Sequence, residues 1–334
     1  MAYTTVNKSS DYFNTKLYTG TGSNQSLTGV GFQPDLIWWK CRNSAKNHGL
    51  TDAVRGNTKI IRSNESSVES TDSTYIQSFD SDGTTIGSNG NINSNGDTFC
   101  LWNWKANGAG SANTNGDIAS TVSANTTSGF SIVSWTANGS NNATIGHGLS
   151  STPKIVLYKK LNDVDSWYAV YTFVDGTQDY VVLNDTNAKA DLASGTYGTA
   201  TSTTISNIGF PNSSSLIAYC FADVQGYSKF GKFIGNGNAD GTFVYTGFKP
   251  AFVIQKQSSA SGEYWMMKDN KRETGNQTDA NLYPNANNAE GDTNGIDLLS
   301  NGFKCRTSGA GSNGSGATYI YMAFAEAPLV GSNN

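Results

Sequence analysis

Two histidines, His48 and His147, carry the chemistry that could make this chain an enzyme. His48 stands shortly before Asp52 and near several serines, so a Ser/His/Asp arrangement is the reaction chemistry to consider. No Gly-x-Ser-x-Gly nucleophile elbow accompanies it. Each histidine is flanked by glycine, which is typical of turns, so we expect both to be exposed turn residues. We therefore predict no catalytic residue and no enzymatic activity.

The segment from Phe79 to Asp97 could bind a metal ion, because it offers several oxygen donors. Its carboxylates are Asp80, Asp82 and Asp97, and calcium takes such oxygens at about 2.4 Å. The EF-hand pattern is not met, since no glutamate stands at the bidentate position. Asp, Asn and Gly are also the residues that hairpin turns require. The three aspartates are weak metal candidates, and we expect no cofactor.

The four cysteines, Cys41, Cys100, Cys220 and Cys305, are widely spaced and form no Cys-x-x-Cys pair. This spacing does not suit a zinc ribbon, and the density is too low for a disulfide scaffold. We expect four buried thiols.

Aromatic residues dominate the apolar part of the sequence, with 7 Trp and 16 Tyr. Most should lie in the core. Trp38, Trp102, Trp135 and Trp265 are the candidates for a subunit interface or for stacking on a sugar, and the sequence does not distinguish these two roles.

The polar composition favours an all-β chain of 334 residues. Charged residues make up 14%, and Asn, Ser, Thr and Gly take their place, as suits tight turns and exposed strand faces. The net charge of −4 argues against a nucleic-acid partner. There is no signal peptide and no apolar run long enough to span a membrane, so we expect synthesis in a host cytoplasm and no membrane insertion.

Three related blocks recur in the same order along the chain. A proline followed by a short apolar strand occurs at Pro34, Pro153 and Pro250, each preceded by a hairpin-like stretch that begins with Phe13, Phe130 or Phe230. Each copy closes with an aromatic strand, namely DTFCLWNWKA, SLIAYCFADV or TYIYMAFAEA.

The repeat predicts three tandem, divergent β-sandwich-like modules of about 100 residues each. The expected boundaries are module 1 at 1–110, a Gly/Ser/Thr/Asn-rich linker at 111–126, module 2 at 127–226 and module 3 at 227–334. In the last closing strand both faces are apolar or aromatic. We expect such strands to be buried between a partner sheet and a neighbouring module or subunit.

With these blocks in view, the chain resembles a repeat family of marine bacteriophage virion proteins, of the tail-fibre and capsid-decoration type. The segments that carry the resemblance are Tyr18–Ser44, Asp52–Lys59, Ser78–Gly108 and Tyr321–Gly331. Copy one matches closely, and copy two more loosely. The resemblance implies a β-sandwich-like module on the outside of the particle and implies no reaction.

Two functions follow from these observations. The first is a structural protein of the virion surface that acts by assembly with capsid or tail proteins, with a symmetric homo-oligomer such as a trimer expected. The second is a carbohydrate-binding adhesin of the tail fibre that grips host surface glycans. A polysaccharide-degrading enzyme is a minor third reading.

Overall fold

The computed structural model describes residues 4–193 and 195–327, and these fold almost entirely into antiparallel strands. This confirms the predicted all-β class. None of the helices in the described part of the chain is long and apolar enough to cross a membrane.

The first repeat supplies the elements up to β9. They are η1 (Ser9–Asp11), β1 (Phe13–Thr19), β2 (Gln25–Thr28), β3 (Leu36–Cys41), β4 (Gly49–Asp52), β5 (Lys59–Ile60), β6 (Ser70–Thr71), β7 (Ile76–Asp80), β8 (Gly83–Ile86), α1 (Gly90–Asn93) and β9 (Thr98–Trp104).

The second repeat follows from β10 onward. Its strands are β10 (Ser111–Asn113), β11 (Ser120–Asn125), β12 (Phe130–Thr136), β13 (Thr144–Gly146), β14 (Ile155–Lys160), β15 (Trp167–Tyr171), β16 (Asp179–Val182), β17 (Ala190–Asp191), β18 (Thr204–Ser206) and β19 (Ser215–Phe221).

The third repeat completes the chain. It contains β20 (Ser228–Ile234), β21 (Phe243–Tyr245), β22 (Lys249–Gln257), β23 (Met266–Asp269), β24 (Thr278–Asn281), β25 (Gly291–Leu299), β26 (Gly302–Cys305), α2 (Ala310–Asn313) and β27 (Thr318–Ala327).

One strand order occurs in all three repeats. The inner sheets are β1-β9-β3-β4 in repeat one, β12-β19-β14-β15 within the eight-stranded sheet of repeat two, and β20-β27-β22-β23 in repeat three. The closing strand therefore always lies between the first strand and the proline-led strand. Smaller outer sheets, β2-β8-β7, β13-β18 and β21-β26-β25-β24, cover one face of each inner sheet.

The three prolines have equivalent surroundings. Pro34, Pro153 and Pro250 are all buried, and each stands at the start of the strand that pairs with the closing strand. Pro250 lies within β22, at a bulge in its pairing with β27. A proline donates no backbone hydrogen bond, so it fits the beginning of a strand or a bulge.

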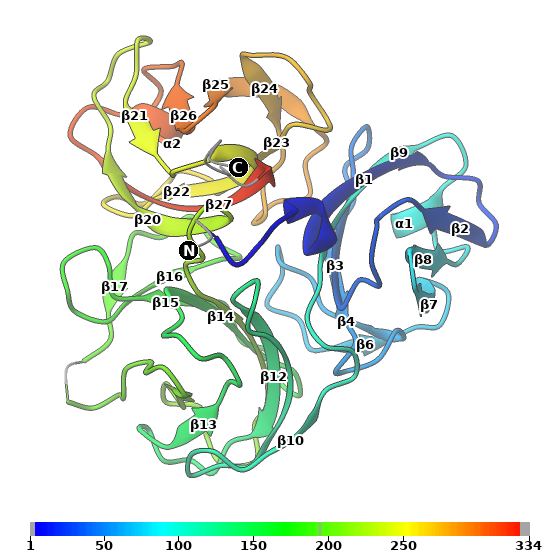
Figure 1. Cartoon of the computed structure of the whole chain (residues 1–334), viewed down its shortest axis with the longest axis vertical. Helices are drawn as coiled ribbons and strands as arrows, with labels where there is room; N and C mark the ends of the chain where they lie inside the picture. The colour runs from blue at the N-terminus through cyan, green and yellow to red at the C-terminus, as the bar shows by residue number, and fades with distance from the viewer. Residues whose placement is uncertain (1–3, 194, 328–334) are drawn as a thin grey trace.

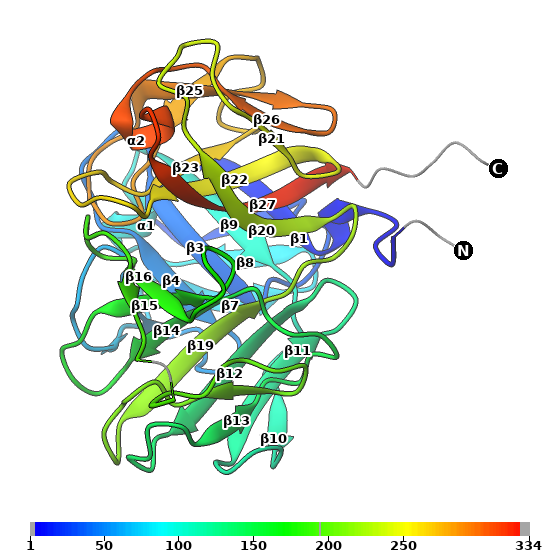
Figure 2. The same ribbon diagram turned by 90° about the vertical axis from the view of Figure 1, so that its left-hand side faces the viewer.

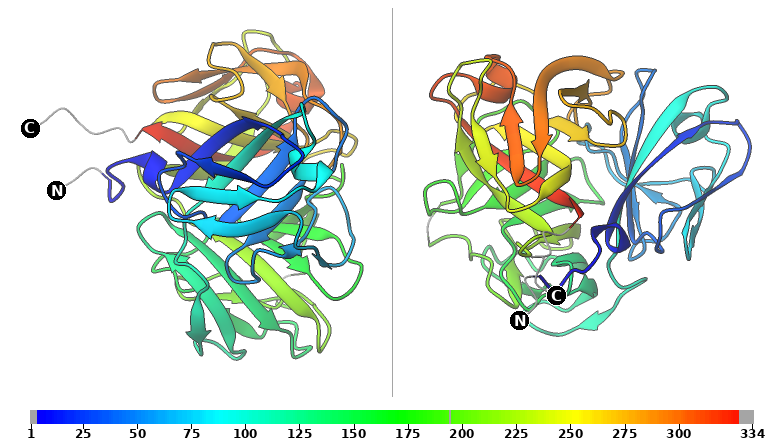
Figure 3. Two further views of the ribbon diagram at one scale, coloured as in Figure 1. Left: turned by 90° about the vertical axis from the view of Figure 1, so that its right-hand side faces the viewer. Right: turned by 45° about the horizontal axis from the view of Figure 1, so that its top comes forward.

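The inner sheets stand around one central axis, with the outer sheets facing away from it (Figure 1). Figure 3 shows the same arrangement from the side of repeat one and with repeat three forward. Phe324 of repeat three illustrates the contact at the axis. Its ring lies 5.3 Å from Phe13, 5.8 Å from Trp104, 5.9 Å from Phe221 and 5.7 Å from Phe230.

The closing strands are thus buried on both faces. From their second residue, β9 and β19 are buried throughout, and β27 is buried from Tyr319 to Ala325. One face packs in the central core shared by all three repeats, and the other packs under the repeat's own outer sheet. The prediction that these strands are buried against a partner sheet and a neighbouring module is confirmed.

Residues 111–126 are not the separate linker that the composition predicted. They contain β10 and β11, and β11 pairs along its whole length with β12, from Ser120 opposite Trp135 to Asn125 opposite Phe130. Val122 of β11 is buried in the core of repeat two. The Ser, Thr and Asn residues that suggested a linker are those of an added edge strand.

The alignment by leading phenylalanines is wrong for the third repeat. Phe13 and Phe130 lie opposite Trp104 and Phe221, whereas Phe230 lies opposite Met322 and Ser228 takes the place opposite Phe324. The shift is two residues. Because side chains alternate along a strand with a period of two, Phe230 still faces the central core.

Candidate functional site: the joints between repeats

The histidines are not exposed turn residues; both are buried. His48 is 1% exposed, and its Nδ1 accepts a hydrogen bond from Trp38 Nε1 at 2.9 Å. Burial lowers the pKa of His48 well below its usual value, so the ring is neutral at pH 7. The glycine beside it serves close packing, because a Cβ on Gly49 would lie 2.0 Å from the Trp39 ring.

His48 occupies the place that tryptophan holds in the other repeats. Its backbone N–H donates to Asn64 Oδ1, as that of Trp167 does to Asn184 Oδ1 and that of Trp265 to Asn285 Oδ1. His48 therefore occupies a core position of the repeat. A Ser/His/Asp site is not formed, since Asp52 is bonded to other residues.

His147 is also part of the packing, inside repeat two. It is 0% exposed; its Nδ1 accepts from the Leu149 N–H at 3.1 Å, and its Nε2 therefore donates to the Thr201 carbonyl at 3.2 Å. Burial lowers its pKa. A Cβ on neighbouring Gly148 would lie 2.8 Å from Val122, so here too glycine permits close contact.

The three aspartates proposed as weak metal ligands are not brought together. Asp82 accepts from the N–H groups of Gly29 and Gly31, and Asp80 accepts from Thr85 Oγ1 at 2.8 Å. Asp97 forms an ion pair with Lys46 at 2.6 Å. Asp80 therefore stabilises its own hairpin, whereas Asp82 and Asp97 hold other turns in place, and the three form no common site.

The tryptophan candidates for sugar stacking are all buried. Trp38, Trp102, Trp135 and Trp265 are 2%, 0%, 4% and 1% exposed. None offers a ring face to a ligand, so a glycan role for these four residues is wrong. Trp102 and Trp265 do lie at contacts between repeats, described below. The four cysteines are buried and free, as predicted.

The joint between repeats one and two is built on a buried Asp–Arg pair. Asp52 Oδ2 accepts from Arg55 Nε at 2.6 Å and from the Tyr219 hydroxyl of repeat two at 2.8 Å. Arg55 also bonds Glu69 at 3.0 Å and the Leu50 carbonyl. Asp52 and the Arg55 side chain are at most 4% exposed, so the pair needs these bonds to offset the cost of burial.

The joint between repeats three and one repeats this arrangement. Asp269 Oδ2 accepts from Arg272 Nε at 2.6 Å and from Trp102 Nε1 of repeat one at 3.0 Å. Arg272 also bonds Glu290 at 2.8 Å and the Met267 carbonyl. Although burial alone would raise the pKa of Asp269, Arg272 holds it below 3.8.

The joint between repeats two and three has different residues at the same places. Tyr171 ends β15 as Asp52 ends β4 and Asp269 ends β23, and Val174 stands in the place of the arginine. A backbone bond that recurs at all three joints identifies the residue equivalent to Glu69 and Glu290. The N–H groups of Glu69, Lys189 and Glu290 donate to carbonyls in a loop of the next repeat, those of Leu161, Ser258 and Arg42 respectively. Lysine thus replaces glutamate at this joint.

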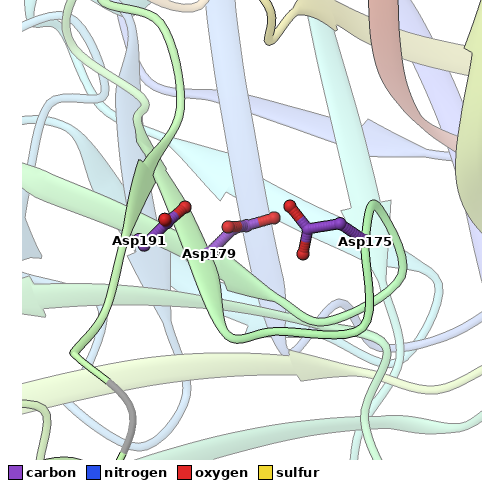
Figure 4. Close-up of side chains that lie close together, drawn as sticks. All are labelled: Asp175, Asp179 and Asp191. Carbon is purple, nitrogen blue, oxygen red and sulfur yellow. The ribbon is translucent and has the colours of Figure 1, made fainter.

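Lys189 draws three carboxylates around it. Its Nζ lies 2.9, 2.8 and 2.8 Å from oxygens of Asp175, Asp179 and Asp191. Figure 4 shows these carboxylates side by side, on the turn before β16, on β16 and on β17. Hydrogen bonds to the carboxylates raise the pKa of Lys189, and burial raises that of Asp179.

Three such carboxylates could hold a divalent cation, since their oxygens lie within 4.8 Å of one another. The Lys189 ammonium already lies within hydrogen-bond distance of all three. The cluster therefore corresponds to the Arg–Glu pairs at the other two joints. Here the positive charge comes from Lys189, at the position that glutamate holds in the other two repeats.

Each inner sheet also carries one equivalent buried lysine. Lys40, Lys159 and Lys256 are 0% exposed, and burial lowers the pKa of each to about 8. Lys159 Nζ donates to the Ser66 carbonyl of repeat one, and Lys256 Nζ to the Thr186 carbonyl of repeat two. Lys159 and Lys256 thus bond across the joints, whereas Lys40 Nζ donates to the Cys41 carbonyl of its own repeat.

Sequence reasoning missed the Asp-x-x-Arg pairs. Their signal was present, because DAVR at Asp52–Arg55 and DNKR at Asp269–Arg272 follow the fourth strand in copies one and three. Which residues they would meet depends on how the sheets stand around the axis. Every charged group described at the joints has a partner, so the arrangement serves to hold the repeats together.

A model of the family described as Domain of unknown function (DUF7483) matches residues 8–328, and so spans all three repeats. Neither a curated protein nor a solved structure matches the chain.

Proposed function

Since the chain belongs to the DUF7483 family, a domain of unknown function, we propose its role from its own geometry and from the phage resemblance. The proposed role is a structural protein of a bacteriophage particle surface, which acts by contact with capsid or tail proteins and catalyses no reaction.

The observation that carries this proposal is the fusion of three sandwiches around one core. A single chain builds the arrangement that a ring of three subunits would otherwise need. Aromatic rings, the Arg42–Glu290 ion pair and hydrogen bonds to the buried aspartates join its parts. Such a body holds its shape without a partner. A rigid unit with three similar sides suits a fixed place on a symmetric particle.

The composition of the surface fits the same role. Charged residues are 14% of the chain, and many of those described are paired with each other. A contact made by neutral hydroxyl and amide groups depends little on ionic strength, because salt screens charges and not hydrogen bonds. We expect attachment to the particle to persist at high salt.

The test is to locate the chain in purified particles. A version carrying a small label at an exposed position should appear at one kind of site in particle images, and it should stay bound in about 1 M salt. Sedimentation of the free chain measures its oligomeric state. A purified chain that is monomeric and has no place on the particle contradicts the proposal.

A glycan-binding role is the second candidate, and one exposed aromatic pair favours it. Tyr264 is 43% exposed and packs against Tyr283 at 5.1 Å, and the Tyr283 hydroxyl lies 3.1 Å from Thr293 Oγ1. A ring beside hydroxyl groups suits stacking on a sugar. Binding on a glycan array that Tyr264→Ala abolishes would support this role, and binding unaffected by that change would not.

A further inference from the structure

The first strand of each inner sheet presents a free edge, and the three repeats treat this edge differently. In repeat two, β11 covers the edge of β12. The chain before β11 also bridges to the outer strand β13, through Gly116 and Ile118 opposite Ile145. One extended segment therefore closes this whole side of the sandwich.

Repeat three leaves the same side open. Within the described residues, no strand pairs with the outer edge of β20 or of β21. Figure 2 shows both strands in the foreground of repeat three. Phe243 and Tyr245 are 43% and 63% exposed, and Ile234 at the end of β20 is 51% exposed. Thr242 Oγ1 donates to the Ile234 carbonyl, so the residue before β21 lies against the end of β20.

Repeat one is a natural control for this comparison. Its edge strands β1 and β2 also lack a covering strand among the described residues, but Thr19, Ser26 and Thr28 are the exposed residues there. Water solvates such an edge well. The open side of repeat three is different because it exposes large apolar side chains, which is typical of a contact surface.

We propose that the β20–β21 side of repeat three accepts an extended strand donated by another virion protein, as β12 accepts β11. This inference rests on the proposed function. Strand addition supplies affinity through backbone hydrogen bonds and specificity through alternate side chains. On this edge the Phe230 N–H is already bonded to Asp223 Oδ1 and the Ile234 carbonyl to Thr242, so the partner would pair between them, at Lys232 and the Ile234 N–H.

We assign this strand to another polypeptide. Residues 222–227, between β19 and β20, are too few to supply it. A second copy of this chain fits poorly, because antiparallel pairing of β20 with itself would bring Lys229 and Lys232 of both copies into one short ladder.

The chemistry of the partner strand follows from the same comparison. In β11, Val122 is buried beside the sandwich core and Thr121 is exposed. The donated strand should likewise alternate β-branched apolar residues with Ser or Thr. The strand needs no acidic residue, because Lys232 Nζ already donates to the Val174 carbonyl of repeat two and Lys229 is paired with Asp223.

Photocrosslinking on the particle tests this inference. A benzoylphenylalanine at Tyr245 should crosslink to an extended segment of one particle protein, at least tenfold more than the same probe at Tyr264, which has an exposed ring elsewhere on repeat three. Ile234→Glu should weaken particle binding at least tenfold, whereas Thr19→Glu at the equivalent end of the β1 edge should leave it unchanged. Thermal melting of each variant verifies its folding.

The outcomes separate the two claims. A chain that occupies the particle without a crosslink at Tyr245, with equal crosslinks at both positions, or with crosslinks to a second copy overturns the strand addition and leaves the virion role standing. A chain absent from the particle overturns both.

Discussion

Tyr219→Phe should destabilise the whole chain, although it removes a single oxygen atom. Tyr219 is 0% exposed, and its hydroxyl donates to Asp52 Oδ2 across the joint between repeats one and two. Asp52 keeps its bonds to Arg55 Nε and to two backbone N–H groups. The substitution therefore removes the bond to Asp52 and a longer bond at 3.3 Å that the hydroxyl accepts from Arg55 Nη2, and we expect a loss of about 1.5–3 kcal/mol.

Equilibrium unfolding in urea measures this loss. Because the three repeats share one core, we expect a single transition whose midpoint falls while its slope is unchanged. Tyr264→Phe is the matched control, since its ring is 43% exposed, and it should change the free energy of unfolding by less than about 0.5 kcal/mol.

Two results would refute the reasoning. The first is a Tyr219→Phe variant as stable as the control, which would mean that the bond across the joint contributes nothing. The second is separate transitions for the repeats, with only one of them affected. That pattern would show that the repeats unfold as independent units, contrary to a shared core.

Three further predictions test other parts of the structure. Phe324→Ala should lower the free energy of unfolding by about 3–5 kcal/mol in the same urea assay, because it leaves a cavity among rings from all three repeats; a loss below about 1 kcal/mol contradicts the central core. The pKa of Asp269 is below its unfolded value near 3.8, so its contribution to stability is complete above that value and is lost as the pH falls through the lower folded pKa. Urea unfolding between pH 3 and 7 should therefore show a free energy of unfolding that depends less on pH below 4 for Asp269→Asn than for the natural chain. An equal dependence on pH in the two chains would refute the assignment. A chelator should leave the melting midpoint unchanged, because the Lys189 ammonium already contacts all three carboxylates of the cluster, whereas Lys189→Met should lower that midpoint. A chelator-induced drop in the natural chain would instead indicate a bound metal ion.

Some features of the fold could be predicted from the sequence because they depend on local patterns. Proline before a short apolar run marked the start of three equivalent strands, and apolar residues on both faces of TYIYMAFAEA marked a strand buried on both sides. The four thiols were predicted to be buried because cysteine is commonly a core residue.

The joints could not be predicted, because their partners come from different repeats. Nothing in the local pattern around Asp52 shows that Tyr219 will donate to it. The glycines beside His48 and His147 were interpreted as turn signals, yet they permit close packing of buried rings. A glycine beside a polar residue is compatible with a turn and with close packing of a buried ring, and tertiary contacts decide between the two.

The different residues at the joint between repeats two and three have a consequence for folding. If all three contacts were built alike, any repeat could dock beside any other, and neighbouring chains could exchange repeats during synthesis. Asp52 and Asp269 each accept from a donor of the neighbouring repeat, Tyr219 or Trp102, whereas the equivalent residue of repeat three is Met322, which donates nothing. Repeat three docked in a wrong place would therefore leave a buried carboxylate without this bond, so the difference favours the native order.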